Sequence, residues 1–280
     1  MLIGLSGKKQ SGKTTLSNFI HGHEMKRHDV IQNFEIDNQG NLIVNYVQFD
    51  EQGKEDTGMA VFDLWQYSDQ FIDYAQRFIW PLIKGYNFAD ALKELCINLF
   101  DIPYECLYGT NEHKNKLQEH LRWENMPGVI SKSDALHLEN GSHLDFTTHE
   151  PGPMTAREFM QYFGTDIMRK TYQPVWINNC IKRIEDDQSP IAIVSDCRFT
   201  NEIEAVQSAG GKVIRLTRNP FDENHSSETE VDDEDCDAII DNTNMTIDES
   251  CNAFLDILVD LGATQKIRAF NHRKGMTTVK

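Results

Sequence analysis

The first residues whose types and spacing could do chemistry lie near the N-terminus, where residues 7–14, GKKQSGKT, fit the pattern G-x-x-x-x-G-K-[ST]. Its two glycines allow the backbone to curl so that consecutive N–H groups point into one concavity, and a following helix adds the positive end of its dipole. Such a loop binds the phosphates of a nucleoside triphosphate, because Lys13 can reach the β- and γ-phosphates and the Thr14 hydroxyl can hold Mg²⁺. We therefore predict a site for ATP and Mg²⁺ whose nucleotide-binding residues are Gly7, Lys8, Gln10, Ser11, Gly12, Lys13, Thr14 and Thr15.

The pattern has this meaning only between a strand and a helix, and its flanks fit. Residues 1–5 form a short apolar run, and residues 15–20 can open a helix. Residues 191–194 are a second apolar run, typical of a strand buried on both faces. Alternating strands and helices that begin with a phosphate-binding loop predict an α/β fold, with a doubly wound parallel sheet flanked by helices. Its other expected elements are helices over 88–100, 155–168, 176–184, 201–209 and 248–261, and strands over 212–217 and 238–240.

In a doubly wound sheet the ligands lie at the carboxyl ends of the strands. Asp196 follows the 191–194 strand, where a carboxylate usually orders Mg²⁺, and we expect Thr200 to cap the next helix better than Asp196 would. Arg198 and Arg218 follow two neighbouring strands and have side chains long enough to reach a transferring phosphate. We predict Lys13, Asp196, Arg198 and Arg218 as catalytic residues, with Thr14 and Asp196 as metal ligands. The polar loop from Arg218 to about residue 231 could close over ATP as a lid. It overlaps an acidic stretch over 222–237.

A segment between the first helix and the next strand of the sheet has a different character. Residues 33–49 alternate apolar and polar residues around Asn-Gln-Gly at 38–40, which predicts a β-hairpin. The aromatic-rich residues 59–83 predict a short strand and a helix ending before Pro81. We interpret residues of about 30–83 as an insertion in a single domain of residues 1–265, followed by a basic tail over 266–280. His21, His23 and His28 are expected at the exposed end of the first helix rather than in a metal site.

Polar residues also occur on two later helices that are otherwise patterned for burial. The 88–100 helix carries Asp90 and Lys93 in its first turn and places Leu92, Leu95, Cys96 and Leu99 on one face. Residues 104–153 are polar and expected to be irregular, a length that compact domains tolerate mainly for function. A capping-box pattern then begins the 155–168 helix, which carries Gln161, Asp166 and, just beyond it, Arg169.

Taken in order, these motifs resemble the deoxynucleoside monophosphate kinases of tailed bacteriophages, a resemblance that implies the fold of a P-loop kinase. The resemblance spans most of the chain apart from the insertion and the basic tail. It rests on GKKQSGKT (7–14), FADALK (88–93), RWENMPG (122–128), QYFGTD (161–166) with WIN (176–178), SDCRFTNE (195–202), GGKVIRLTR (210–218) and HSSE (225–228).

The resemblance implies the reaction ATP + dNMP → ADP + dNDP, supplying phage DNA synthesis, with the monophosphate pocket built by residues 88–93 and 155–176. Lys93 and Arg169 could then meet the acceptor phosphate, while Gln161 or Asp166 could hydrogen-bond a base edge. The alternative is that Lys93 and Arg169 merely pair with Asp90 and Asp166 at the surface. The substrate-binding residues expected in the family pocket are Asp90, Lys93, Arg122, Trp123, Gln161, Asp166, Arg169 and Trp176.

Two other functions stay open from the residues alone. A hydroxyl acceptor, such as a hydroxymethylated base in phage DNA, would need a carboxylate base near the γ-phosphate, and Asp90 could serve. A non-enzymatic module could bind nucleotide to control assembly, but a second set of polar residues argues against it.

Composition limits the partners. A formal net charge of −17 argues against a protein that coats nucleic acid, although a few focused cations can still bind small anions. No apolar run approaches the roughly 20 residues of a membrane span. The six cysteines are scattered, as in reduced cytoplasmic proteins. We therefore expect small nucleotides as partners in the cytoplasm, neither membrane nor nucleic acid, and leave a homodimer open.

Overall fold

The computed structural model describes residues 1–49, 55–66, 68–131, 147–219 and 235–266. Its contacts divide the chain into two compact units. Unit 1 comprises Met1–Asn87 and Ile181–Lys280, and unit 2 comprises Phe88–Cys180. Each unit has its own hydrophobic core.

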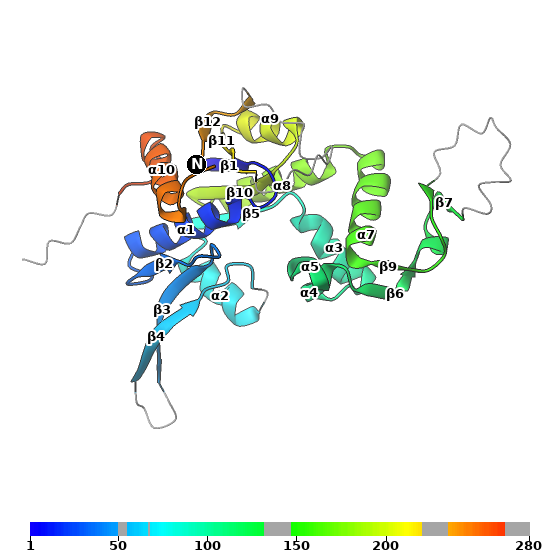
Figure 1. Cartoon of the computed structure of the whole chain (residues 1–280), viewed down its shortest axis with the longest axis horizontal. Coiled ribbons are helices and arrows are strands. Elements are labelled where there is room, and N and C mark those ends of the chain that lie inside the picture. The colour runs from blue at the N-terminus through cyan, green and yellow to red at the C-terminus, as the bar shows by residue number, and fades with distance from the viewer. Residues whose placement is uncertain (50–54, 67, 132–146, 220–234, 267–280) are drawn as a thin grey trace, which may run out of the picture. The chain divides into compact units, whose positions relative to one another are not determined.

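Unit 1 contains a five-stranded sheet in the order β12-β11-β1-β10-β5, in which every neighbouring pair is parallel (Figure 1). The strand β1 is central, and the chain places β10 on one side of it and β11 on the other. Strand order therefore reverses at β1, which is where ligands bind in open α/β sheets. The strands are β1 (Leu2–Ser6), β5 (Ile83–Tyr86), β10 (Ile191–Cys197), β11 (Lys212–Leu216) and β12 (Ala238–Ile240).

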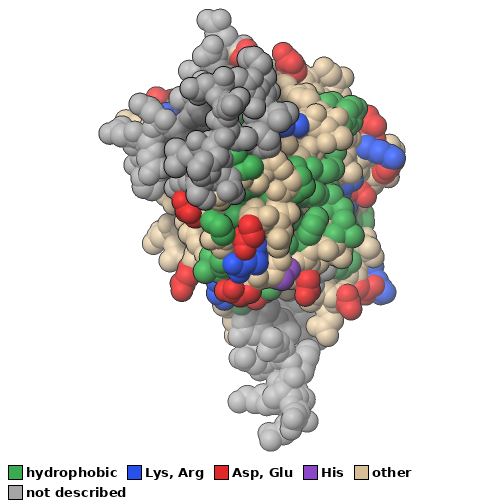
Figure 2. Space-filling view, turned by 90° about the vertical axis from the view of Figure 1, so that its right-hand side faces the viewer, with side chains coloured by type: hydrophobic (Ala, Val, Ile, Leu, Met, Phe, Trp, Pro, Cys, Tyr) green, Lys and Arg blue, Asp and Glu red, His purple; other side chains and the backbone are tan. Residues whose placement is uncertain are grey.

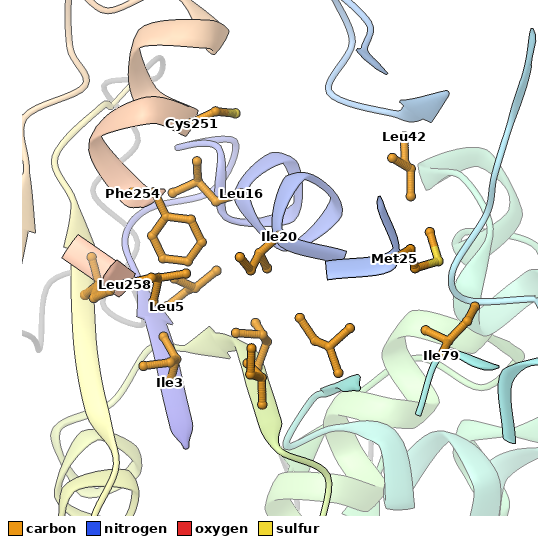
Figure 3. Close-up of a cluster of buried hydrophobic side chains, with 14 of the residues drawn as sticks. Ile3, Leu5, Leu16, Ile20, Met25, Leu42, Ile79, Cys251, Phe254 and Leu258 are labelled. Atoms are coloured by element: carbon orange, nitrogen blue, oxygen red, sulfur yellow. The ribbon is translucent and has the colours of Figure 1, made fainter. Parts of the chain in front are cut away.

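Helices cover both faces of this sheet because the strands are apolar on both sides. Ile3 and Leu5 of β1 pack with side chains of α1 (Lys13–Arg27) and α10 (Ile247–Asp260), as Figure 3 shows. The intervening Gly4 faces the other way, where a Cβ would lie 3.4 Å from Val206 of α9 (Thr200–Ser208). Parallel strands flanked by helices on two faces confirm the predicted α/β architecture.

The insertion forms a sheet of its own, as the hairpin pattern predicts. Strands β2 (Phe34–Ile36), β3 (Leu42–Phe49) and β4 (Glu55–Val61) pair antiparallel in that order, apart from the main sheet. They are followed by α2 (Asp69–Phe78), whose first turn is capped by Ser68. Strand β5, which was not predicted from the sequence, follows α2 directly and pairs with β10 from Ile83 opposite Ile191.

The histidines of α1 correct one expectation. His21 and His23 are each only 3% exposed, so they do not lie on an exposed helix end. Burial lowers the pKa of His21 to about 4, although a hydrogen bond to the Ser17 carbonyl opposes the shift. His23 contacts the carboxylate of Glu24 through Nδ1 (3.0 Å). His28 alone of the three is exposed. Core packing therefore accounts for two of these three histidines.

Unit 2 is built around helices that pack on small sheets. Strand β6 pairs antiparallel with β9, and β7 pairs parallel with β8, so the 104–153 stretch holds regular structure where an irregular segment was expected. The elements are α3 (Asp90–Phe100), α4 (Tyr104–Tyr108), α5 (Asn111–Lys114), β6 (Leu117–Arg122), the 3₁₀ turn η1 (Trp123–Asn125), β7 (Val129–Ile130), β8 (Thr147–Thr148), β9 (Pro153–Thr155), α7 (Ala156–Gln161), η2 (Tyr162–Arg169) and α8 (Val175–Asp187), which continues into unit 1.

The helix predicted over 155–168 changes type along its length. Its start is the predicted capping box, with Thr155 accepting from the Glu158 N–H (3.1 Å) and Glu158 accepting from the Thr155 N–H (2.8 Å). Beyond Gln161 the chain continues as an eight-residue π-helix, η2. π-Helical turns are rare and are found frequently at functional sites.

The predicted apolar face of α3 is only partly correct. Leu92 and Cys96 are buried in the core of unit 2, whereas Leu99 is 67% exposed. Figure 2, which looks onto the right-hand side of the view in Figure 1, shows hydrophobic side chains exposed among charged ones. None of the helices in the described ranges is both long and apolar enough to cross a membrane.

Candidate active site

The 7–14 loop joins the end of β1 to the start of α1, the context that its pattern requires. Gly7 has a φ of +141°, and a Cβ there would lie 2.7 Å from both the Leu216 carbonyl and Ser11 Oγ. Gly12 caps α1 with a φ of +106°. Because residues other than glycine rarely adopt such positive φ values, the two glycines make the tight path of the loop possible.

Lys13 places its ammonium group across this loop. Its Nζ donates to the carbonyls of Gly7 (2.5 Å) and Lys8 (2.7 Å) and lies 3.3 Å from Ser11 Oγ. The first helical hydrogen bond of α1 runs from Leu16 N to Gly12 O (3.0 Å). The backbone N–H groups before Leu16 therefore lie in the first turn, where an α-helix provides no carbonyl partner of its own. Ammonium, amides and helix dipole thus concentrate positive charge at one point of a chain whose net charge is −17.

Asp196 lies beside the start of the loop, in an irregularity of β10. Gly4 of β1 pairs with Val194 and Ser6 pairs with Cys197, so two residues of β10, Ser195 and Asp196, oppose one residue of β1. Such a bulge re-aims side chains and is common next to active sites. Asp196 is half-buried, and Ser195 is held by a hydrogen bond to Asn87 Oδ1 (2.8 Å). The sheet therefore brings Asp196 and the 7–14 loop to the same edge.

The start of α9 differs from the expected cap. The helix begins at Thr200, and the buried carboxylate of Glu202 accepts hydrogen bonds from the N–H groups of Arg198 (2.8 Å) and Phe199 (3.2 Å). Glu202, not Thr200, therefore satisfies the amides before the helix. This cap fixes the backbone of Arg198, an exposed residue just beyond β10.

Arg218 lies just beyond β11 and is also exposed. Its N–H donates to Oδ1 of Asn242 (2.9 Å), and Nδ2 of Asn242 donates to the Ser11 carbonyl (2.7 Å). Asn242 is not among the site residues predicted from the sequence, although an asparagine just after a short strand at the ligand edge was the available signal. The predicted lid falls mainly on residues 220–234, which lie outside the described residues.

The insertion also contacts the beginning of α1. Its β2–β3 turn is organised by Asp37, whose Oδ1 accepts from the N–H groups of Gln39 and Asn41, both at 2.8 Å. The carbonyl of Gly40 in this turn accepts from Asn18 Nδ2 (2.8 Å), and a Cβ at Gly40 would collide with Thr15 Oγ1. The insertion therefore supports the first turn of the helix that follows the 7–14 loop.

Five residues predicted for the acceptor lie on helices of unit 2. Asp90 is buried in the first turn of α3, and Lys93 on the same helix lies with Nζ 4.2 Å from the centre of the Tyr108 ring. Gln161 is exposed at the end of α7, while Asp166 and Arg169 are half-buried on the π-helix. Asp166 lies 3.8 Å from Lys170 Nζ. Helices α3 and α7 pack through Phe100 and Phe159, whose ring centres lie 4.7 Å apart in the core of unit 2.

The other three predicted residues are structurally engaged. Arg122 Nε donates to Glu124 Oε1 (2.6 Å), and this bond holds the pKa of Glu124 at about 2. Trp123 is buried and stacks on His149 with ring centres 3.9 Å apart. Trp176 is buried and donates its indole N–H to the Gly164 carbonyl of the π-helix (3.1 Å). Both tryptophans therefore belong to the core of unit 2.

Comparison with known proteins decides the family. The sequence model of the family described as "Deoxynucleotide monophosphate kinase" matches residues 86–251, more than half of the chain. The chain belongs to the deoxynucleotide monophosphate kinase family. A protein of Acanthamoeba polyphaga mimivirus, provisionally named a deoxynucleotide monophosphate kinase, is 25% identical over 162 residues, which are 52% of this chain and 67% of that protein.

Membership of a kinase family makes this protein a phosphotransferase. The matched range contains all of unit 2 together with Asp196, Arg198 and Arg218. It begins at Tyr86, after the 7–14 loop and after the insertion. The parallel sheet of unit 1 is what joins the loop to the family-matched part, because β1 pairs with both β10 and β11.

Proposed function

We propose that this kinase transfers the γ-phosphate of ATP to a deoxynucleoside 5′-monophosphate: ATP + dNMP → ADP + dNDP. One observation carries the proposal. A glycine-built loop, crossed by the Lys13 ammonium, lies where the strand order reverses in a chain of the deoxynucleotide monophosphate kinase family. Both the position and the charge of this loop suit the phosphates of a nucleotide.

The loop supplies the ATP site. Gly7, Lys8, Gln10, Ser11 and Gly12 contribute backbone around the phosphates, with Thr15 in the first turn of α1. The Lys13 ammonium, now bonded to two neutral carbonyls, gains a stronger partner in a phosphate oxygen.

Thr14 and Asp196 fit Mg²⁺ because both offer oxygen, the ligand that this cation prefers. The described residues hold no group of three or more His, Cys, Asp or Glu able to bind a metal by itself. Mg²⁺ on a nucleotide needs only one or two protein oxygens besides the phosphates, so this donor set is sufficient. The bound ion would neutralise charge on the transferring phosphate.

The chemistry asks little of the protein beyond alignment. A nucleoside monophosphate is already an oxyanion at neutral pH, so a strong general base is unnecessary. The new bond forms between an acceptor phosphate oxygen and the γ-phosphorus as the β–γ bridging bond of ATP breaks, leaving ADP. Arg198 and Arg218 extend from backbone fixed by Glu202 and Asn242, and they would neutralise charge that spreads over the transferring group.

The acceptor is assigned to unit 2. Lys93 and Arg169 offer positive charge to the acceptor phosphate, and Gln161 or Asp166 offers hydrogen bonds to a base edge. Asp90, Arg122, Trp123 and Trp176 complete the predicted set. The location of Asp166 and Arg169 on a π-helix supports this assignment, because such turns are frequent at functional sites.

The proposal is tested by incubating the purified protein with ATP, Mg²⁺ and each of the four deoxynucleoside monophosphates, with the ribonucleotides in parallel. Chromatography of the products should show a diphosphate of at least one deoxynucleotide, together with an equal amount of ADP. ADP formed without any diphosphate would contradict the proposal. Phosphorylation of hydroxymethylated DNA, with no nucleotide diphosphate formed, would instead assign a hydroxyl acceptor.

A further inference from the structure

The side chain of Asn242, two residues beyond β12, is buried and satisfied at both ends. Only 4% of the residue is exposed. Its Nδ2 donates to the Ser11 carbonyl (2.7 Å), and its Oδ1 accepts from the Arg218 N–H (2.9 Å). An amide is the group that offers a donor and an acceptor at this spacing, and reversing it would place oxygen against oxygen and nitrogen against N–H.

The bond to Ser11 sets the direction of the next amide in the loop. A trans peptide is planar, so the Gly12 N–H points opposite to the Ser11 C=O. With that carbonyl turned toward Asn242, the Gly12 N–H is turned away from it, and Gly12 is also the N-cap of α1. Backbone amides oriented in this way create an anion-binding concavity.

The same side chain fixes the backbone from which Arg218 extends. We propose that Asn242 is a positioning residue for ATP, which orients the Gly12 amide and sets the starting point of Arg218 relative to the 7–14 loop. The proposal rests on the function proposed above. It adds a residue that contacts neither phosphate nor metal, but acts through Ser11, Gly12 and Arg218.

Other contacts hold the strand ends together without this side chain, so variants of Asn242 are expected to fold. Thr217 Oγ1 donates to Asp241 Oδ1 (2.6 Å), and the Thr217 N–H donates to the Ile240 carbonyl (3.2 Å). The backbone N–H of Asn242 itself donates to Ile240 O (3.0 Å). The amide side chain is therefore not needed to hold the ends of β11 and β12 together.

The test compares Asn242→Asp and Asn242→Ala with a matched control, Asn244→Asp, because Asn244 is exposed two residues away. Asp keeps the acceptor for Arg218 but sets a carboxylate oxygen against the Ser11 carbonyl, whereas Ala removes both bonds. Calorimetric titration with Mg-ATP should show about tenfold weaker binding for both Asn242 variants. Binding of the monophosphate, titrated alone, and the Asn244 control should be unchanged.

A second readout does not depend on catalysis. In ¹H–¹⁵N spectra the Gly12 amide signal should move on addition of Mg-ATP in the wild type, and this shift should shrink in both Asn242 variants. ATP affinity equal to wild type in the folded variants, or equal weakening of ATP and monophosphate, would overturn the positioning role. A wild type that binds ATP but forms no diphosphate would contradict the proposed function alone, since the ATP titrations would still judge Asn242.

Discussion

Replacing Gly7 by alanine should damage both stability and nucleotide binding, because two separate costs meet at this position. The backbone has a φ of +141°, a region that non-glycine residues occupy only at a cost of about 1–3 kcal/mol. The added Cβ would also lie 2.7 Å from the Leu216 carbonyl and from Ser11 Oγ. Ser11 Oγ can rotate, but the carbonyl belongs to β11 and cannot move without disturbing the sheet. Overpacking of this kind costs a further 1–3 kcal/mol or so, for a total of about 4 kcal/mol.

Gly152→Ala separates the two costs. Gly152 has a similar φ of +150°, but a Cβ there would meet nothing within 4 Å. This control should lose only about 2 kcal/mol, the conformational part. Chemical denaturation of both variants, followed by Mg-ATP titration, provides the comparison. Gly7→Ala should lose about 2 kcal/mol more than the control and bind ATP at least tenfold more weakly. Equal stability losses, with ATP binding intact in both, would refute the idea that Gly7 is required by close packing of the loop on β11.

Three further changes probe the metal site, the acceptor and a buried carboxylate. Asp196→Asn removes charge at constant size, so it should raise the Mg²⁺ concentration for half-maximal turnover about tenfold while leaving ATP affinity nearly unchanged; an unchanged Mg²⁺ dependence would remove Asp196 from the metal site. Arg169→Ala should weaken binding of the monophosphate about tenfold or more and leave ATP affinity unchanged, whereas the neighbouring exposed control Lys170→Ala should leave both affinities unchanged. Equal losses of affinity for both ligands in Arg169→Ala would place the acceptor elsewhere. Glu24 is 1% exposed, and although burial raises its pKa, hydrogen bonds from His23, Arg27 and Thr264 hold the pKa at about 2, below its usual 4.5. Its contribution of about 3 kcal/mol should therefore be present above pH 4.5 and lost as the pH falls toward 2. Glu24→Gln should be destabilised at pH 7 and show a weaker loss of unfolding free energy over that range; parallel wild-type and variant curves would contradict this assignment.

Features with local causes were predictable from the sequence. Three such features depend on residues within a few positions of one another: the strand, loop and helix around Lys13, the hairpin of β2 and β3, and the capping box of Thr155. Their signals are turn chemistry, periodicity and caps, which act over short distances in the chain. The parallel sheet followed from the alternation of such elements.

Features that depend on distant partners were not predictable in the same way. Strand β5 is four residues long, and its burial depends on pairing with β10 more than a hundred residues later. The bulge at Asp196 exists only against β1, and Glu24, next to the buried His23, accepts a hydrogen bond from Thr264, 240 residues later in the chain. The contacts of Asn242 likewise depend on the position of β12 in the sheet. Single-sequence patterns carry no information on such pairings.

The transfer of labelled phosphate tests the central claim most directly. Wild type, Lys13→Ala and the control Lys9→Ala would each receive γ-³²P-labelled ATP, Mg²⁺ and a deoxynucleoside monophosphate. Lys9 is the exposed lysine of the same loop, so its loss removes equal charge from a different place. Label should appear in the deoxynucleoside diphosphate with wild type and Lys9→Ala, and fall by about a thousandfold or more with a folded Lys13→Ala. Equal transfer by all three proteins, or label released only as inorganic phosphate, would contradict the account.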